Sequence, residues 1–264
     1  MISITSAQLY SLIAAYLWPM TRILGLMALA PLYNNGTIPA RVKVGLSFLL
    51  AMIVAPSVPA GPAMDPMSLP GLLILAQQLV IGLAMGLAMR IAFAAMEMAG
   101  TITGLTMGLG FATFFDPQSQ GQSSAVSQIY ALLAIMIYLT ANLHLVVLST
   151  LIDSFTTMPI SATPFDGDRL RLLVAWGGRI FSSGLQLSLP LVTALLITNL
   201  ALGVLTRAAP QLNLFGIGFP ITMGAGFVMI AVSLPYLTTP VLRLLEEGIS
   251  VMQHITAASL PPIK

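Results

Sequence analysis

Between Gly104 and Gln128 the chain reads GLTMGLGFATFFDPQSQGQSSAVSQ, a glycine-rich polar segment between two apolar runs. Each flanking run is long enough to cross a bilayer, which takes about 20 apolar residues in a helix. Backbone that is neither helix nor closed barrel persists at membrane depth only when protein buries it or when it lines a water-filled cavity. The segment therefore indicates either a pore lining, a plug or a substrate site, or else an inert connector in the water outside the bilayer.

The composition excludes an ordinary soluble domain. Of the 264 residues, 57% are hydrophobic and only 7% are charged, whereas soluble domains carry about 25% charged residues. We therefore expect an integral membrane protein or part of a membrane-embedded assembly. The net charge of +2 is too small to favour nucleic acid as a partner.

Six apolar regions follow one another along the chain and predict an all-α, membrane-associated protein of several helices. They run approximately over residues 7–32, 42–58, 69–109, 124–152, 170–205 and 212–245. The third and fifth regions are longer than one span requires, so we expect these helices to be tilted, broken or folded back. Positive charges divide equally between the two sides, so the positive-inside rule leaves the orientation open.

Ionisable residues are rare inside these regions and must face protein or water, because a charge in hydrocarbon costs at least a few kcal/mol. Arg90 and Glu97 are seven residues apart and so lie on roughly the same face of a helix. They predict either a polar inner wall or subunit contact, or a structural ion pair within the bundle. Arg22 in the first region is open to the same two interpretations.

No pattern in the sequence predicts an enzyme, a metal site or a cofactor. The chain has no cysteine, and its histidines, His144 and His254, have no second ligand at a suitable spacing. A Walker motif and a nucleophile elbow are both missing from the sequence. The paired glycines Gly82 and Gly86 are explained by close helix packing.

Bulky aromatic residues precede small polar ones in the 104–128 segment, an order that suits a constriction beside a flexible gate. The Asp-Pro step inside it favours a turn. Methionines cluster in the third region; they could seal a pore or simply fill the apolar core. The candidate gate residues are Phe111, Phe114, Phe115, Asp116, Pro117, Gln118 and Gln120.

Two segments carry a resemblance to a known family. GLGFATFFDPQSQGQSSAVSQ, together with RAAPQLNLFGIGFP at Arg207 to Pro220, resembles the FliR family of flagellar biosynthetic proteins. That family is related to the SctT components of virulence type III secretion. The resemblance covers nearly the whole chain, and its most specific part is PQLN with the Phe-Gly-x-Gly-Phe-Pro tail.

The resemblance implies a subunit of the flagellar type III protein-export gate. It implies a hetero-oligomeric pore complex with FliP-like and FliQ-like subunits and an FlhB-like protein. Unfolded flagellar cargo proteins would pass through this complex in the bacterial inner membrane, at the flagellar basal body, with membrane lipid around it. Over-long helices packed on each other fit an assembly that stands partly above the membrane plane.

The resemblance also implies an internal division of the chain. Residues 1–205 would form a FliP-like helical part that includes the loop 104–128, and residues 206–264 a FliQ-like C-terminal helical hairpin. The loop from Phe111 to Gln122 would be a plug in the pore. From the residues themselves we expect Arg207, Pro210, Gln211 and Asn213 to hold a subunit or helix junction, because proline breaks a helix and the amides can pair exposed backbone groups.

Two other functions stay open from the sequence. A secondary transporter for a small solute would need a cluster of charged residues at the bilayer midplane, and this chain has few. A structural scaffold would place the loop away from any pore.

Overall fold

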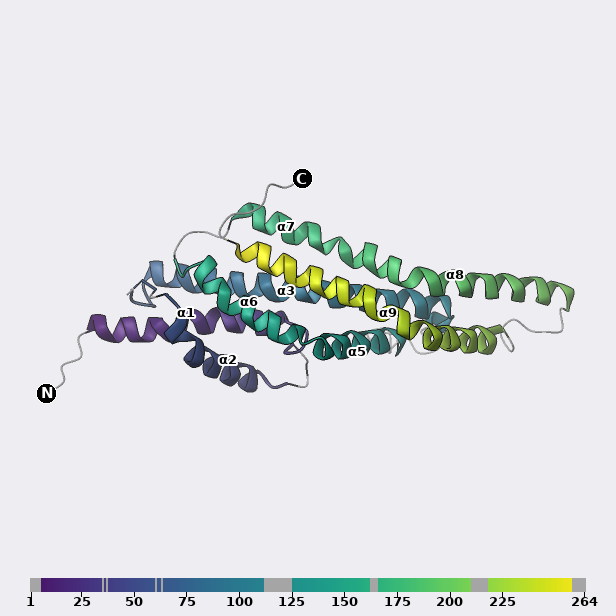
Figure 1. The fold of residues 1–264 in the computed structure, drawn as a ribbon, viewed down its shortest axis with the longest axis horizontal. Helices are drawn as coiled ribbons and strands as arrows, with labels where there is room; N and C mark the ends of the chain where they lie inside the picture. The colour runs from purple at the N-terminus through teal and green to yellow at the C-terminus, as the bar shows by residue number, and fades with distance from the viewer. Residues whose placement is uncertain are drawn as a thin grey trace. The chain divides into compact units, whose positions relative to one another are not determined.

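The computed structural model is built from helices throughout the residues it describes, which confirms the predicted all-α class. It describes residues 6–34, 36, 38–59, 61–62, 64–111, 125–161, 166–209 and 218–257. The α-helices in chain order are α1 (Ser6–Leu29), α2 (Ala40–Val54), α3 (Leu69–Thr106), α5 (Ala125–Thr140), α6 (Leu143–Thr157), α7 (Gly167–Gly177), α8 (Arg179–Ala208) and α9 (Phe219–Thr256) (Figure 1). Two short 3-10 helices, η1 (Ala55–Ser57) and η2 (Leu109–Phe111), follow α2 and α3.

Five of the described helical stretches are long and apolar enough to cross a membrane. They are Gln8–Leu29, Ala40–Ser57, Leu69–Thr106, Gly167–Ala208 and Phe219–Thr256. A sixth would be added if α5 and α6 counted together as one span. The chain is therefore a membrane protein by helix length and composition, as predicted.

The over-long third apolar region forms helix α3. It is one uninterrupted helix of 38 residues, about 57 Å long at 1.5 Å per residue, against a hydrocarbon core of about 30 Å. Its proline, Pro70, lies in the first turn, where the missing N–H costs nothing. The helix is neither broken nor folded back, so it must tilt or extend beyond the hydrocarbon.

The fourth apolar region, by contrast, is not one helix. Asn142 adopts a left-handed conformation with φ 56° and separates α5 from α6. Asparagine is among the few residues other than glycine that enter this conformation readily, since its short polar side chain can hydrogen-bond locally. A single asparagine inside an apolar run therefore marked a helix break that hydropathy did not reveal.

The chain groups into two compact units, each with its own packing. Unit 1 comprises Met1–Ile91, Asn142–Gly177 and Glu246–Lys264, and unit 2 comprises Ala92–Ala141 and Gly178–Leu245. Helices α3 and α9 contribute residues to both units.

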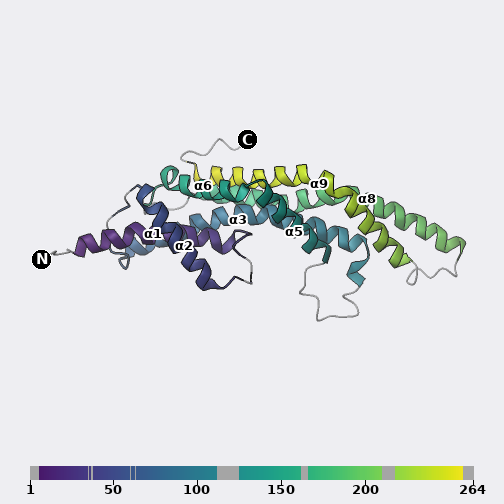
Figure 2. The same ribbon diagram turned by 60° about the horizontal axis from the view of Figure 1, so that its bottom comes forward.

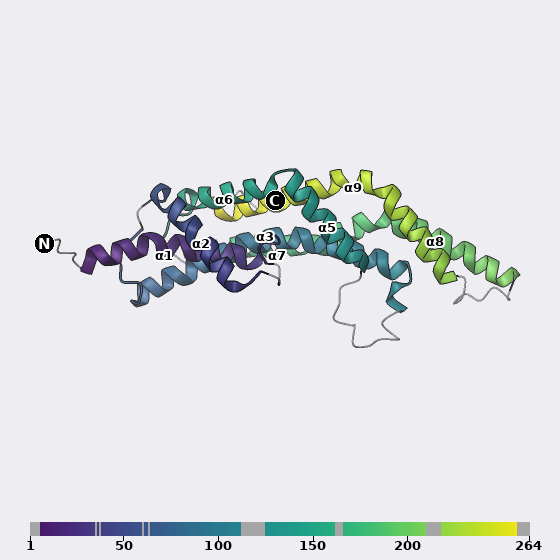
Figure 3. The same ribbon diagram turned by 90° about the horizontal axis from the view of Figure 1, so that it is seen from below.

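In unit 1, helix α1 lies on α3 at backbone-contact distance. A Cβ atom added to Gly82 would come 2.1 Å from the carbonyl oxygen of Arg22, and one added to Gly86 would come 2.7 Å from that of Leu26. A Cβ atom added to Gly25 of α1 would likewise lie 2.7 Å from the carbonyl oxygen of Leu79 on α3. The glycines therefore serve close helix packing, as expected from their spacing. Helix α2 contacts α1, as Figures 1 and 3 show.

In unit 2, the second half of α3 contacts α5 and α8. A Cβ atom added to Gly100 would lie 2.6 Å from the Cα of Ser127 on α5. A Cβ atom added to Gly184 of α8 would lie 2.9 Å from the Cβ of Met98 on α3. The rings of Phe93 and Tyr138 meet edge to face at 5.6 Å.

The methionines of α3 are part of the packed interior of this chain. Met85, Met89, Met96 and Met107 are almost completely buried. Methionine is unbranched and fills irregular gaps between helices. Of the two interpretations, core packing fits these four residues.

The last quarter of the chain, predicted to be a helical hairpin, contains one long helix among its described residues. Within 206–264, the described residues from Phe219 to Thr256 form one helix, α9, which carries Pro235 and Pro240 inside it. A hairpin would therefore have to pair α9 with the preceding α8, which ends at Ala208. The division of the chain at residue 205 stays a prediction.

Replacing Gly82 with alanine should destabilise the protein. The added methyl collides with the backbone of Arg22, and overpacking typically costs about 1–3 kcal/mol, which outweighs a gain of roughly 1 kcal/mol in helix propensity. Gly203→Ala in α8 is the matched control, because no atom lies within 4 Å of its added Cβ. The thermal unfolding midpoint in mild detergent should fall for Gly82→Ala and stay level or rise for Gly203→Ala. Equal midpoints would contradict close α1–α3 packing.

Candidate functional site

The candidate gate loop is defined in the structure by its two ends. Phe111 closes the short helix η2, which follows α3, and helix α5 begins at Ala125. The other candidate gate residues lie outside the described part of the chain. They are Phe114, Phe115, Asp116, Pro117, Gln118 and Gln120.

The first end of the loop leaves α3 at Gly108. Its φ is +88°, a left-handed conformation that glycine adopts without strain. Its N–H donates to the carbonyl of Leu105 at 3.0 Å, and the preceding Met107 donates to that of Thr103 at 3.0 Å. A Cβ atom at Gly108 would lie 2.6 Å from Cε1 of Phe219, so a larger residue would meet the start of α9.

Helix α9 holds this end of the loop in place. Met107 is fully buried, and a Cβ atom added to Gly226 would come 2.5 Å from its Cγ. The hydroxyl of Thr222 donates to the carbonyl of Phe219 at 3.0 Å and lies 3.4 Å from the carbonyl oxygen of Met107. Figure 2 shows the end of α3 beside the start of α9.

The second end of the loop returns to the same helix. The hydroxyl of Ser127, in the first turn of α5, donates to the backbone carbonyl of Glu97 at 2.8 Å. Gly100 lets the backbone of α5 approach α3 at this point. Both ends of the segment 112–124 are therefore fixed to the last turns of α3, one through α9 and the other through α5.

Arg90 and Glu97 are both half-buried on α3. The backbone carbonyl of Glu97 accepts hydrogen bonds from Ser127 and, at 2.8 Å, from the hydroxyl of Thr101. Both charged residues also take part in further polar or electrostatic interactions. Glu97 thus lies at the point where α5 is joined to α3.

The side chain of Arg22 is fully buried and joins three segments of unit 1. Its Nε donates to Oε1 of Gln78 on α3 at 2.8 Å. Nη1 donates to the backbone carbonyl of Ser154 at 2.8 Å and to its hydroxyl at 3.0 Å, and Nη2 donates to the carbonyl of Met158 at 2.9 Å. One guanidinium therefore connects α1, α3 and the end of α6.

Neutral groups surround the charge of Arg22. Among the described residues, no carboxylate lies within ion-pair distance of it. Two of its acceptors are carbonyls at the C-terminal end of α6, where the helix dipole is negative. The guanidinium carbon also lies 4.3 Å from the ring centroid of Phe155, a cation–π contact. Within this chain the guanidinium thus joins helices through neutral acceptors, and a contact of Arg22 with another subunit stays a prediction.

Sequence reasoning missed the partners of Arg22. Gln77 and Gln78 interrupt an apolar run, and that signal could have identified an amide facing a buried charge. No sequence signal could have identified Ser154 or Met158, which lie 132 and 136 residues from Arg22. Both accept through backbone carbonyls, which every residue carries, and Ser154 accepts through its hydroxyl as well.

A second arginine contacts helix-end carbonyls in unit 1. Arg169 of α7 donates through Nη1 to the carbonyl of Ile255 and through Nη2 to that of Ala257 at 2.9 Å. Nearby, the indole N–H of Trp176 donates to the carbonyl of Ala88 on α3 at 2.8 Å. These bonds attach α7 to the end of α9 and to α3.

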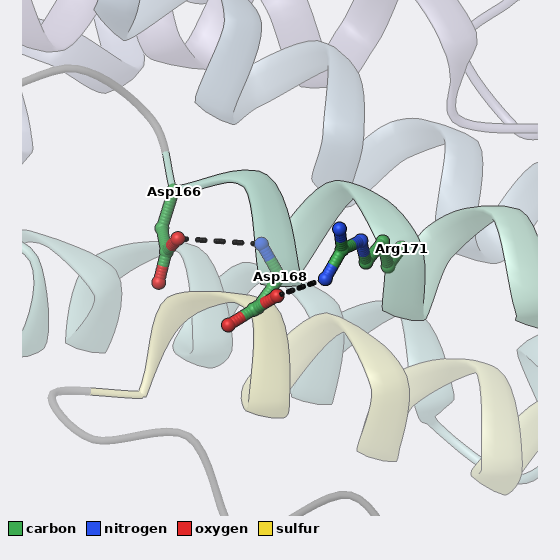
Figure 4. A network of polar contacts seen from close by, with 3 residues as sticks. All are labelled: Asp166, Asp168 and Arg171. Carbon is green, nitrogen blue, oxygen red and sulfur yellow. Dashed lines mark hydrogen bonds and ion pairs between the residues drawn. The ribbon is translucent and has the colours of Figure 1, made fainter.

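The polar contacts at the start of α7 differ in kind, because they are exposed (Figure 4). Asp168 receives a hydrogen bond from Arg171 at 3.0 Å, with 51% and 81% of the two side chains exposed. The carboxylate of Asp166 accepts from the backbone N–H of Asp168 at 3.3 Å. Surface pairs of this type contribute little to stability.

The two histidines lie in helices without metal-binding neighbours. Nδ1 of His254 lies 2.7 Å from the carbonyl oxygen of Ser250 in the same helix, and His144 is half-buried in α6. Within the described ranges, no three His, Asp or Glu side chains come together to hold a metal ion.

Arg207 is exposed in the last turn of α8, where a positive charge complements the helix dipole. The other residues of the predicted junction, Pro210, Gln211 and Asn213, lie outside the described residues. The junction hypothesis stays a prediction.

Comparison with known proteins identifies the family. A family model described as "Bacterial export proteins, family 1" matches residues 13–248. The chain belongs to this family. It is 41% identical over 255 residues to the flagellar biosynthetic protein FliR of Escherichia coli K12, covering 97% of each chain. FliR of Pectobacterium carotovorum is similar to the same extent, and FliR of Bacillus subtilis is 28% identical over 253 residues. Family membership supports a role in the flagellar export apparatus and confirms the resemblance seen in the sequence.

Replacing Arg22 with lysine should destabilise the protein although the charge is kept. A lysine ammonium lacks the planar fork that reaches Gln78, Ser154 and Met158 together, and each buried acceptor left unpaired costs about 1–3 kcal/mol. Arg171→Lys is the matched control at an exposed site. Thermal unfolding in mild detergent should show a lower midpoint for Arg22→Lys only. Equal midpoints for both variants would show that the contacts of Arg22 do not stabilise the fold.

Proposed function

We propose that this chain is a subunit of the flagellar type III protein-export gate and forms part of the channel wall. Unfolded flagellar subunits would pass along it, driven by energy supplied elsewhere, and the chain itself would change no chemical bond. Two findings support the proposal: membership of the bacterial export family and the set of helices able to cross a membrane.

The exposed apolar surface supports a complex with several partners. On α8, Phe181 and Leu200 are 66% and 71% exposed, and Tyr236 on α9 is 78% exposed. Apolar surface on this scale requires lipid or protein neighbours. We propose that FliP-like and FliQ-like subunits and an FlhB-like protein cover much of it, in the inner membrane at the flagellar basal body.

The loop from Phe111 to Gln122 is proposed as the plug of this channel. The observation that carries this is the attachment of both loop ends to α3, at Gly108 and at Ser127. Fixed ends allow the middle of the loop to move while the helices around it stay packed. A plug must leave at low cost, and a few aromatic contacts suit that better than buried ion pairs, which are costly to break.

A scaffold without pore contact is the competing function. It would place the same loop in water as a connector, and cargo trapped during export would not crosslink to it. A small-solute transporter would show flux in proteoliposomes containing this chain alone. The export proposal predicts crosslinks to cargo and no such flux.

Removing the plug should open the resting channel to ions. Losing the contacts of Phe114 and Phe115, roughly 1.5 kcal/mol each, should raise the open population about a hundredfold, and the deletion below removes Phe111 as well. Two variants test this: deletion of Gly110 to Gln122, and replacement of residues 112–122 by a glycine–serine linker of equal length. Conductance of the complex in planar bilayers, and growth inhibition by a normally excluded solute, are the measurements.

The equal-length linker separates loss of the plug from strain in a shortened loop. Assembly should be normal with it, because Gly108 and Ser127 keep their contacts. Assembled complexes that stay as tight as wild type would identify the loop as a connector and favour the scaffold.

Arg207→Ala combined with Asn213→Ala should lower the yield of the assembled complex. Both side chains are proposed to hold a junction rather than to touch cargo, so export should fall only as far as assembly falls. The yield of complex co-purified in mild detergent, compared with secretion from the same cells, tests this. Arg171→Ala is the control for loss of an exposed arginine. Normal assembly with lost export would reject the junction.

A further inference from the structure

An open apolar groove in unit 1 has a single charge at one end. It has a volume of about 550 Å³ and is lined by Met20 of α1 and by Ala40, Arg41, Val44, Gly45 and Phe48 of α2. An added Cβ at Gly45 would meet no atom within 4 Å, so the middle of the groove is empty space. Arg41, Val44 and Phe48 follow the spacing of one helix face, with the arginine at the end where α2 begins.

The start of α2 carries an unusual excess of positive charge. Arg41 and Lys43 both lie in its first turn, which contains no acidic residue. The carbonyl of Pro39, the residue before the helix, accepts from the N–H groups of Val42 and Lys43, and no side chain caps the helix. Cations are unfavourable at a helix N-terminus, whereas an anion is stabilised there. Neither cation forms an ion pair with the described residues, so an anion from outside the chain would be favoured.

The groove also has the position and direction that a membrane lipid requires. Ala40–Ser57 is a candidate span by length and composition; if it crosses the bilayer, Arg41 at its first turn would lie near the phospholipid headgroups. From Arg41 to Phe48 the groove follows α2 for about 10 Å at 1.5 Å per residue. One leaflet contributes about 15 Å of hydrocarbon. The groove is therefore long enough to hold an acyl chain over about two thirds of the thickness of one leaflet.

We propose that this groove binds an anionic phospholipid, with one acyl chain on Val44, Gly45 and Phe48 and the phosphate at Arg41 and the start of α2. The combination of a cationic end and an apolar continuation matches a molecule that has phosphate next to hydrocarbon. This site is independent of the plug and would stand if the plug proposal failed.

The test uses the intact complex in nanodiscs with photoactivatable lipids. Phosphatidylglycerol and phosphatidylcholine carrying the same diazirine-labelled acyl chain are each supplied, and labelled peptides are mapped by mass spectrometry. Peptides containing Val44 to Phe48 should be labelled about fivefold more by phosphatidylglycerol, the preference expected for one cation near the membrane surface. Soluble glycerol 3-phosphate should not compete, which separates a lipid site from a simple phosphate site.

Two variants test the two ends of the site separately. Gly45→Leu fills the groove and should abolish labelling by either lipid, whereas Gly203→Leu, at an equally open helix position, should not. Arg41→Gln should keep labelling but remove the preference for phosphatidylglycerol.

Three results would overturn the proposal. Equal labelling of the wild type by both lipids would remove the anionic requirement. Unchanged labelling in Gly45→Leu would place the lipid elsewhere. Loss of assembly in Gly45→Leu with normal assembly in Gly203→Leu would assign the groove to a partner subunit instead.

Discussion

The fold depends on how closely other helices approach α3. In both units the contact is made at backbone distance, and at each crossing a glycine provides the space: Gly82 and Gly86 toward α1, Gly100 toward α5, and Gly184 of α8 toward α3. In a membrane, helices gain little from excluding water, so close packing of small residues must supply much of the attraction between them. A single methyl group at one of these glycines would therefore force the two facing helices apart.

Two arginines of unit 1 are bound by the ends of other helices. Arg22 and Arg169 donate to carbonyls at the C-terminal ends of α6 and α9. Carbonyls at a helix C-terminus lack the later N–H groups that would pair them in the helix interior, although that of Ser154 also accepts from the N–H of Met158. An arginine fork therefore satisfies helix ends in apolar surroundings and joins them to another helix. The arrangement needs no carboxylate, which is consistent with the low acid content of the sequence.

The same packing holds both ends of the proposed plug. The loop leaves α3 through the left-handed Gly108, which α9 covers, and the chain returns through Ser127 to the carbonyl of Glu97. These contacts hold the two ends of the loop. The proposed plug function would then be separable from folding, whereas the glycine crossings and Arg22 act on the stability of the fold.

The sequence by itself determined the membrane class, the helical fold and the family, because apolar length, charge content and motif residues are local properties. It misplaced the ends of the loop, since residues 104–106 belong to α3 and residues 125–128 to α5. The tertiary structure alone decided that α3 is continuous, that Asn142 breaks the fourth apolar region, and that Arg22 meets Gln78, Ser154 and Met158. These partners lie 56 to 136 residues from Arg22. Two of its acceptors are backbone carbonyls, which look alike in every residue, so only the packing of distant helices selects which of them face a buried charge.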